Sequence, residues 1–401
     1  MGTRRRTTAA LAASALGVSL LVAGTTAAPA EAAGCAATPT LLSRPSISSF
    51  ALPGGATVKI WDTGNLANDL NELRVSVVRI PAGSLTPGVI TAPTISRAAT
   101  PLAMAQRDAR SVVVINGQHF DATVGGIPEK SEIVEGVLRK GNVATEMNLV
   151  AYGPAKTLAW TQSSTHGYLS SVRGRIAFGG LNWQTLSTAG VSVYTSAWGT
   201  RAHPYGPRTV VVTNGIVRGF LAGSRGARTP GVGQQFLTAP AGAISTALGK
   251  LRVGDAVVMR TAPAGFQLDD GIFPHHPIGR PTGLIGVGGA IVRDNVIKAT
   301  CGARDEQLRP RSAFAWLANG DMIVVSASGR ATVNGTRFGG ATVHQFAVLL
   351  HQLGARTAIN LDGGTSTTLL VRTTIGGPLM RLDRGLGEVM RPVVDSLVFR
   401  A

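Results

Sequence analysis

Short apolar runs separated by glycine-rich turns dominate the hydrophobic pattern of this chain. Residues 73–80 alternate apolar and polar positions, which predicts a half-buried strand. Residues 111–115, SVVVI, are continuously β-branched or apolar, which is typical of a strand buried on both faces. Residues 209–213 and 216–220 flank Asn214-Gly215, a sequence that favours a tight hairpin turn. The pattern therefore predicts a strand-rich protein.

Helical periodicity is clearest in residues 342–353. Thr342 can cap this helix, apolar residues recur at helical spacing after it, and Gly354 can end it. Residues 99–110 and 240–248 also have helical character, whereas residues 81–93 are predicted to be loop and residues 251–260 a strand. The expected fold is α/β in the broad sense (α+β), with a single large strand-rich domain, a mixed sheet and a few helices.

The stretch 356–371, RTAINLDGGTSTTLLV, is predicted to be strand, tight turn and strand. Asp362 stands where the first strand stops. Gly363 and Gly364 allow backbone angles that other residues avoid, and hydroxyl side chains follow at 365–368. A carboxylate beside a flexible turn and a hydroxyl cluster is suited to binding or chemistry.

The N-terminus has the pattern of an export signal, with Arg4–Arg6 before an apolar run and small residues at its end. We expect a signal peptide at 1–32, a lead-in segment at 33–72 and one domain at 73–401. The route would be Sec or twin-arginine, and the mature protein would be secreted without stable membrane insertion. For Cys35 and Cys301, we expect a disulfide, with two unpaired thiols as the alternative.

The formal net charge is +17, and the basic residues are spread evenly. No basic arm or aromatic-interleaved patch suggests a nucleic-acid partner. The charge fits attraction to anionic substrates, and solubility alone is the alternative. The Asp-Asp and His-His pairs within 266–282 match no compact ligand spacing, so neither a metal nor another cofactor is predicted.

Four motifs occur in one order along the chain. They are Asn116-Gly117-x-x-Phe120-Asp121, Pro310-Arg311-Ser312-Ala313, Asn360-Leu361-Asp362-Gly363-Gly364-x-Ser366-x-Thr368 and Glu388-x-x-Arg391-Pro392-Val393. In this order the motifs resemble the phosphodiester glycosidase family, whose exported bacterial members are often related to exopolysaccharide. The resemblance covers most of the mature chain.

This resemblance implies hydrolysis of a sugar-1-phosphodiester, such as an N-acetylglucosamine-1-phosphodiester, in cell-wall or extracellular glycans. The implied roles give Asp362 and Glu388 the glycosidase carboxylates. Arg311 would hold the phosphate, together with backbone N–H groups of the Gly363–Ser366 turn, which includes Gly364. The implied substrate-binding residues also include Asn116 and Asp121 for sugar hydroxyls, with Ser366 and Arg391 in the same cleft. His119, which replaces a family residue, is a further candidate for this cleft.

Several positions depart from the family pattern, among them Thr367 and the residues that follow Arg311. Gln118 and His119 replace the usual Gly and Phe, and Thr365 stands where a third glycine is common. The alternative hypothesis is therefore a non-catalytic exported protein that binds glycans or assists exopolysaccharide assembly on the same fold. A glycan or sugar phosphate is the expected partner in both cases, and the sequence leaves the sugar and the oligomeric state open.

Overall fold

The computed structural model describes residues 41–62, 73–123, 125–223, 228–268, 280–300, 307–329, 331–332, 337–383 and 390–401. The chain divides into two compact units, Met1–Gly34 and Cys35–Ala401, and every described residue belongs to the second. The expected signal peptide, both cysteines and Glu388 lie outside the described residues, as do the Asp269-Asp270 and His275-His276 pairs.

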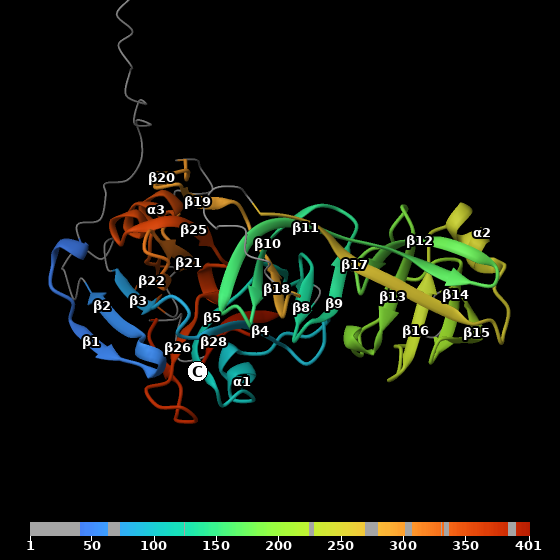
Figure 1. Ribbon diagram of the computed structural model, residues 1–401, viewed down its shortest axis with the longest axis horizontal. Helices are drawn as coiled ribbons and strands as arrows, with labels where there is room; N and C mark the ends of the chain where they lie inside the picture. The colour runs from blue at the N-terminus through green and yellow to red at the C-terminus, as the bar shows by residue number, and fades with distance from the viewer. Residues whose placement is uncertain are drawn as a thin grey trace, which may run out of the picture. The chain divides into compact units, whose positions relative to one another are not determined.

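An eight-stranded antiparallel sheet forms one layer (Figure 1). Its spatial order is β1 (Ser48–Ala51), β2 (Thr57–Asp62), β3 (Arg74–Ile80), β22 (Met322–Ser328), β21 (Arg311–Leu317), β25 (Ala355–Asn360), β19 (Ala290–Arg293) and β20 (Val296–Ile297). Residues along β21 and β22 alternate between two hydrophobic clusters, so the sheet is buried on both faces.

A five-stranded antiparallel sheet is the second layer. Its order is β27 (Met380–Arg381), β26 (Leu369–Val371), β5 (Ser111–Asn116), β28 (Asp395–Arg400) and β4 (Thr86–Thr91). All six residues of β5 are buried, as the continuous β-branched run predicts. The largest core cluster joins this sheet through Leu397 to Val78 of the first sheet and Leu149 of the third.

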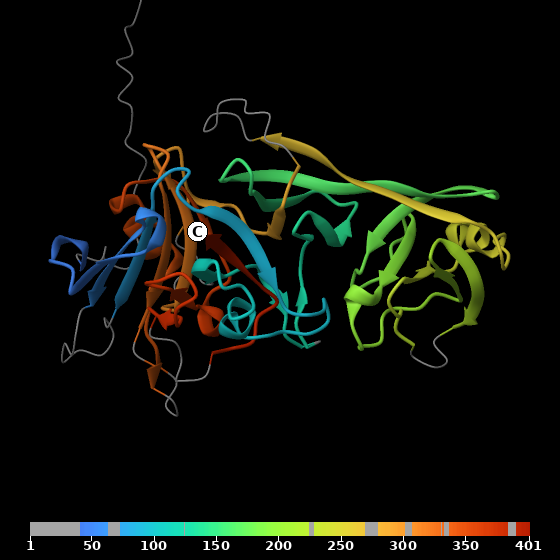
Figure 2. The same ribbon diagram turned by 60° about the horizontal axis from the view of Figure 1, so that its bottom comes forward.

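The third sheet has eleven strands and is mixed, because β12 pairs in parallel with β13. Its order is β15 (Ile216–Ala222), β14 (Arg208–Thr213), β16 (Gln234–Thr238), β13 (Val191–Thr195), β12 (Gly174–Leu181), β9 (Val137–Asn142), β8 (Glu132–Val134), β18 (Gly283–Gly286), β10 (Glu146–Tyr152), β11 (Thr157–Ser171) and β17 (Val257–Leu268). The long strands β11 and β17 run side by side (Figure 2).

Three α-helices occur in the described part of the chain, namely α1 (Pro101–Ala105), α2 (Ala243–Gly249) and α3 (Val343–Gln352). Thr342 caps α3 in a reciprocal capping box with Gln345, and Phe346 and Leu350 pack on the outer face of the eight-stranded sheet. Short pairs β6 (Phe120–Asp121) with β7 (Ile127–Pro128) and β23 (Ala331–Thr332) with β24 (Arg337–Phe338) complete the strands.

The strand-rich mixed fold with few helices confirms the predicted fold class, but three local predictions need correction. The 81–93 loop contains β4, whose Pro87 is tolerated because β4 is an edge strand. The 99–110 helix is only α1, because Gln106 to Arg110 lead into β5. The strand at 251–260 begins only at Val257, because Asp255 accepts the Arg252 N–H in a turn at 2.9 Å.

None of the helices in the described ranges has the length and apolar character needed to span a bilayer.

Candidate active site

The segment 361–368 crosses from β25 in the eight-stranded sheet to β26 in the five-stranded sheet. Its backbone is held by strand ends from both layers: Leu361 N–H donates to Ser312 O at 2.9 Å, and Asp362 N–H donates to Gly117 O at 3.0 Å. The predicted strand, turn and strand are present, with η4 (Gly364–Ser366) as the turn, but the two strands belong to different sheets. The site residues therefore stand where two layers meet.

Both glycines of this segment are required by its geometry. Gly364 has φ +61°, a conformation that residues with a Cβ rarely adopt. A Cβ on Gly363 would lie 2.9 Å from Pro310 O, and the Gly364 N–H donates to the same oxygen at 2.8 Å. The pair thus lets the backbone pack tightly against the start of β21.

Asn116 holds the 361–368 segment in place through hydrogen bonds of its side chain. It is fully buried, its Nδ2 donates to Asp362 O at 2.6 Å, and its Oδ1 accepts from the Ser312 hydroxyl at 2.7 Å and the Thr368 N–H at 3.1 Å. The amide is thus used by internal hydrogen bonds rather than presented to a sugar hydroxyl. Its place in the structure is that of a positioning residue for Asp362.

Asp362 is the carboxylate at the centre of the cluster, and its side chain is 16% exposed. Its Oδ1 accepts the Gly363 N–H at 2.9 Å and lies 3.6 Å from His119 Nε2, while the imidazole is half exposed. Burial raises the pKa of Asp362, and His119, the Ser366 hydroxyl and Arg391 act in the opposite direction. The protonation of Asp362 is thus set by the groups beside it.

Arg391 approaches the turn from the C-terminal segment. Its Nη1 donates to Thr365 Oγ1 at 2.9 Å and to Ser366 Oγ at 3.1 Å. The guanidinium carbon lies 4.9 Å from the centre of the Phe120 ring, within the range of a cation–π contact. Hydroxyls and an aromatic ring therefore orient this cation beside Asp362.

Arg311 lies next to the same turn, since a Cβ on Gly363 would be 3.7 Å from Arg311 Cδ. Its side chain is buried, however, and its guanidinium holds backbone: Nε donates to Ala341 O at 3.0 Å and Nη2 to Gln307 O at 3.0 Å. The structure thus brings Arg311 to the site but directs at least two of its donors into the protein.

Asp121 is placed in a local turn. Its Oδ1 accepts from the Thr123 N–H at 2.9 Å and the Thr123 hydroxyl at 2.6 Å. Of the sequence-predicted residues, the structure groups His119, Asp362, Gly363, Gly364, Ser366 and Arg391, with Asn116 and Arg311 supporting them from within. Glu388 precedes Arg391 by three residues and lies outside the described residues.

A cavity of about 310 Å³ opens beside His119. Its lining is Gln118, His119, Glu129, Lys130, Gly286, Val287 and Gly288. Burial lowers the pKa of Lys130, whose ammonium hydrogen-bonds Val287 O. The sequence motifs do not include Lys130, but the glycine-rich run at 283–295 indicates a close backbone contact in this wall of the cavity. A Cβ on Gly286 would lie 2.2 Å from Lys130 Cβ.

Asp395 lies behind the cluster and was not among the predicted site residues. It is fully buried, and Gln118 donates to both its oxygens, from N–H to Oδ1 at 2.9 Å and from Nε2 to Oδ2 at 2.6 Å. Burial, together with the charge of Glu132, raises the pKa of Asp395 to about 8. Gln118, one of the departures from the family pattern, thus ties the 116–119 turn to β28.

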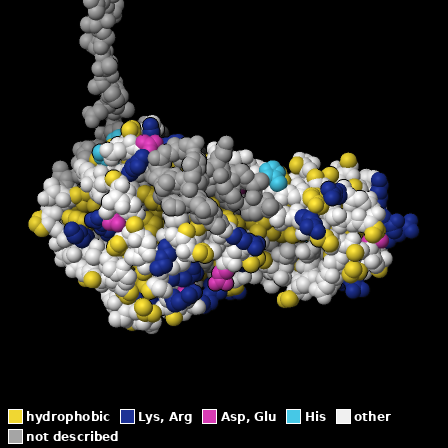
Figure 3. All heavy atoms as spheres, in the orientation of Figure 1, with side chains coloured by type: hydrophobic (Ala, Val, Ile, Leu, Met, Phe, Trp, Pro, Cys, Tyr) yellow, Lys and Arg dark blue, Asp and Glu magenta, His cyan; other side chains and the backbone are white. Residues whose placement is uncertain are grey.

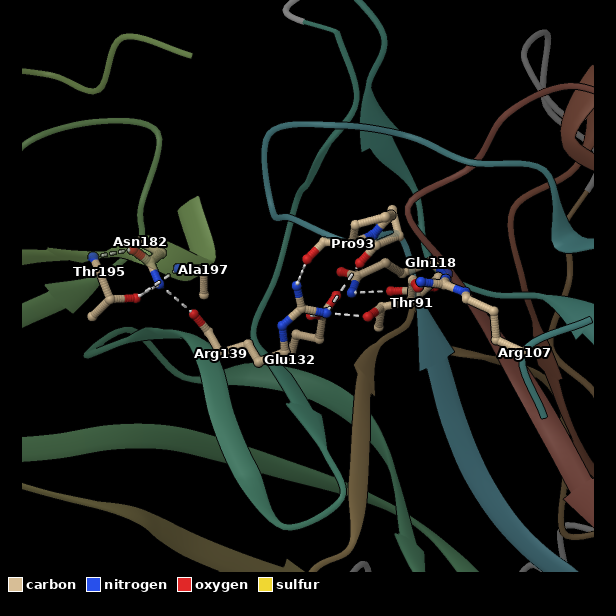
Figure 4. A network of polar contacts seen from close by, with 11 residues as sticks. Thr91, Pro93, Arg107, Gln118, Glu132, Arg139, Asn182, Thr195 and Ala197 are labelled. Carbon is tan, nitrogen blue, oxygen red and sulfur yellow. Dashed lines mark hydrogen bonds and ion pairs between the residues drawn. The ribbon is translucent and has the colours of Figure 1, made fainter. Parts of the chain in front are cut away.

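Glu132 and Arg139 form a second buried group (Figure 4). Arg139 Nη1 lies 3.3 Å from Glu132 Oε1, and the guanidinium also bonds the Thr91 hydroxyl and Pro93 O. Burial raises the pKa of Glu132 to about 7, against the charge of Arg139. In the described ranges, no three His, Cys, Asp or Glu side chains gather in a way that could hold a metal ion.

Part of the chain is similar to a known protein family. A family model described as phosphodiester glycosidase matches residues 207–400. Residues 207–400, slightly less than half of the chain, are thus similar to the phosphodiester glycosidase family. The match confirms the resemblance drawn from the motifs and includes Arg311, Asp362 and Arg391. Asn116 and His119 precede the part matched to the phosphodiester glycosidases. No curated protein is significantly similar to the chain.

Among solved structures, a hypothetical protein from Synechocystis is 22% identical with a TM-score of 0.63, and the match covers 86% of this chain and 62% of that one. A Burkholderia pseudomallei protein assigned as exported is 18% identical with a TM-score of 0.60, covering 82% and 74%. Both share the fold. A zebrafish N-acetylglucosamine-1-phosphodiester alpha-N-acetylglucosaminidase catalytic domain, auto-inhibited by its pro-peptide, is 12% identical with a TM-score of 0.40, covering 91% of each chain.

Proposed function

We propose that this protein is a hydrolase that cleaves a sugar-1-phosphodiester, releasing the sugar and leaving a phosphomonoester. The family supports a glycosidase-type activity. The observation that carries the proposal is the convergence of His119 and Arg391 on the partly buried carboxyl of Asp362, beside a cavity of about 310 Å³.

Arg391 is the residue best placed to recognise the phosphate. Guanidinium groups bind phosphate oxygens through paired hydrogen bonds, and stacking on an aromatic ring orients them. Phe120, Thr365 and Ser366 provide that orientation here. Arg391 thus takes the role that the sequence suggested for Arg311, whose guanidinium bonds to the carbonyls of Gln307 and Ala341.

In the proposed reaction, water adds to the anomeric carbon and the bond from that carbon to the phosphate oxygen breaks. The bonding electron pair leaves with the phosphomonoester, and a carboxylate accepts the proton that water loses. Asp362 is one carboxylate of this chemistry and Glu388 the other, as the resemblance implies. Arg391 stabilises the charge that develops on the leaving phosphate.

The second candidate is an exported glycan-binding protein without turnover. The observation in its favour is Thr365, whose hydroxyl accepts a hydrogen bond from Arg391 Nη1 at 2.9 Å where a glycine is usual in the family. This contact occupies one donor that a phosphate would otherwise use.

The test is incubation of the mature protein with an N-acetylglucosamine-1-phosphodiester and a panel of other sugar-1-phosphodiesters. We expect sugar release that falls about 10²- to 10⁴-fold in Asp362→Asn and about 10²-fold in Arg391→Gln, with Arg44→Gln as an exposed control. Measurable glycan binding with no release from any substrate would establish the second candidate instead.

We further propose that the protein is exported and acts on cell-wall or extracellular glycans, with Cys35 and Cys301 bonded. Peptide mass spectrometry of the secreted protein, with and without reduction, tests the disulfide and the cleavage site after Ala32 together. A mature N-terminus elsewhere, or alkylated cysteines without reduction, would contradict it.

A further inference from the structure

The outward face of β11 carries an ordered set of polar and aromatic side chains. Along Thr157–Ser171, burial alternates: Thr165 and Leu169 are buried in the protein, whereas His166 is exposed and Tyr168 partly exposed. Alternate residues of a strand point to opposite faces, so His166 and Tyr168 share the outward face. His166 Nε2 also lies 2.7 Å from the Ser164 hydroxyl on the same face.

Two arginines flank this row on the neighbouring strands. Arg260 of β17 is directly opposite Tyr168, and Arg175 of β12 is opposite Ser170. Residues directly opposite one another in a sheet point to the same face, so both arginines lie outward with Tyr168. The Arg175 guanidinium carbon is 4.5 Å from the centre of the Tyr168 ring, which orients the guanidinium over the sheet.

The region that contains this face has a strongly biased charge. Residues 157–268 hold ten Lys and Arg and one acidic residue, Asp255, a net charge of ten minus one, or +9. Asp255 is already paired with Arg173 at 3.1 Å. Within the part of the chain that the structure describes, neither Arg175 nor Arg260 has a carboxylate partner. Lys and Arg side chains are spread over the visible side of β12 to β17 (Figure 3).

We propose that the outward face of β12, β11 and β17, defined by His166, Tyr168, Arg175 and Arg260, binds a linear glycan whose units are joined by phosphodiesters. Such a chain offers evenly spaced negative charges to the arginines. Its sugar or polyol units have apolar faces that can pack on exposed Val258, which is opposite Ser170 on this face.

The geometry favours this partner over a single-stranded nucleic acid. Nucleic-acid grooves of this kind stack successive bases on open aromatic rings. The face defined here has one tyrosine, whose ring lies under Arg175, and one imidazole, that of His166, which is hydrogen-bonded to the Ser164 hydroxyl. A row of guanidinium and hydroxyl groups with a single covered ring suits phosphate and hydroxyl groups better than bases.

The face is continuous with the sheet that forms the cavity wall. Gly286, which lines the cavity, is opposite Asn148 of β10, and Glu146 of β10 is opposite Ser163 of β11. From Ser163 to Tyr168 is five residues, or about 17 Å along a strand. Ser163 is buried whereas His166 is exposed, so a chain bound on the face would lie on the opposite side of this sheet from Ser163. The binding proposal does not itself depend on hydrolysis.

The test compares two double variants with the same change in charge. Arg175→Glu with Arg260→Glu alters the face, and Arg44→Glu with Lys59→Glu alters exposed positions of the lead-in and β2. Binding of a poly(glycerol phosphate) chain is measured by calorimetry at about 50 and 200 mM salt, since neutralised phosphates release counterions. We expect at least about tenfold weaker binding in the face variant only, with the salt dependence reduced.

Three outcomes would overturn the proposal: no binding by the unaltered protein, equal loss in both double variants, or binding of single-stranded DNA or anionic vesicles as tight as that of the polymer. Thermal unfolding of both variants controls for folding. Arg175→Lys keeps the charge and weakens the contact with Tyr168, so an intermediate loss is expected. Hydrolysis of a small soluble sugar-1-phosphodiester should be the same in the face variant, which separates failure of this proposal from failure of the proposed function.

Discussion

The protonation of the partly buried carboxyl of Asp362 governs what the candidate site can do. Burial raises the pKa of Asp362, and the group that lowers it most is His119, whose Nε2 lies 3.6 Å from Asp362 Oδ1. A carboxylate that accepts a proton from water must be ionised, so hydrolysis should increase as the pH rises through this raised pKa. His119, which replaces the usual phenylalanine, would thus set the pH range rather than perform the chemistry.

Replacing His119 with phenylalanine should move the acidic limb of the pH profile of kcat/KM to higher pH. The reason is that loss of the imidazolium charge removes an interaction that lowers the pKa of Asp362. Initial rates on a soluble sugar-1-phosphodiester across the pH range measure the shift. His166→Phe, a change of the same kind on β11, is the control, and an unmoved limb in the His119 variant would contradict the role given to it.

Sequence reasoning could find the residues of the site but not the direction of each side chain. Asp362 and Gly364 were predictable because the end of an apolar strand and a glycine in a turn can both be recognised from the neighbouring residues. Arg311 and Asn116 were assigned to ligand binding, yet their donors bond to Ala341 O and Asp362 O. Which way a side chain points at a strand end depends on its partners, 246 positions away for Asn116 and 30 for Arg311, and no local pattern records them.

At the scale of elements, α3 delivers β25 and hence Asp362 to the junction of the two sheets. Its start is fixed by Thr342 Oγ1, which accepts the Gln345 N–H at 3.0 Å, while Gln345 Oε1 accepts the Thr342 N–H at 3.0 Å. Local signals of this kind made α3 and the Asn214-Gly215 hairpin predictable. They could not predict β4, because its proline and glycine resemble a loop and only the neighbouring β28 makes it a strand.

Thr342→Ala should lower the free energy of unfolding by about 1 kcal/mol, because the Gln345 N–H loses the hydroxyl that accepts its hydrogen bond at the helix N-terminus. Urea unfolding followed by circular dichroism measures the change. Thr373→Ala, at an exposed position, should leave the free energy of unfolding nearly unchanged. Equal effects of the two substitutions would show that the cap does not stabilise α3.

At the scale of the whole molecule, Arg139 links parts that are distant in sequence. Its guanidinium contacts Glu132 and the 91–93 backbone, and its carbonyl accepts Asn182 Nδ2 at 2.7 Å (Figure 4). Asn182 in turn bonds Thr195 Oγ1 at 2.9 Å, on β13. The Glu132–Arg139 ion pair thus lies between β4, the edge strand of the five-stranded sheet, and the strands of the eleven-stranded sheet. That sheet carries the outward face of β12, β11 and β17.

Arg139→Ala should destabilise the fold by about 3–5 kcal/mol near pH 8 and by less near pH 5. The pKa of Glu132 is raised to about 7, so its protonated form favours the folded state at low pH and that contribution is lost as the pH rises through about 7. Above that pH the variant leaves a buried carboxylate without its cation. Urea unfolding at both pH values measures the difference, and Arg173→Ala, whose partner Asp255 is on the surface, is the control.

The crossing of segment 361–368 between two sheets has a consequence for how the protein loses its site. Leu361, Asp362 and Gly364 each donate a backbone hydrogen bond to a different neighbour, at Ser312, Gly117 and Pro310. Local fraying of a single loop cannot break all three. The Asp362 carboxyl should therefore be displaced only when the two layers separate, so loss of the proposed activity on heating and global unfolding should be one event.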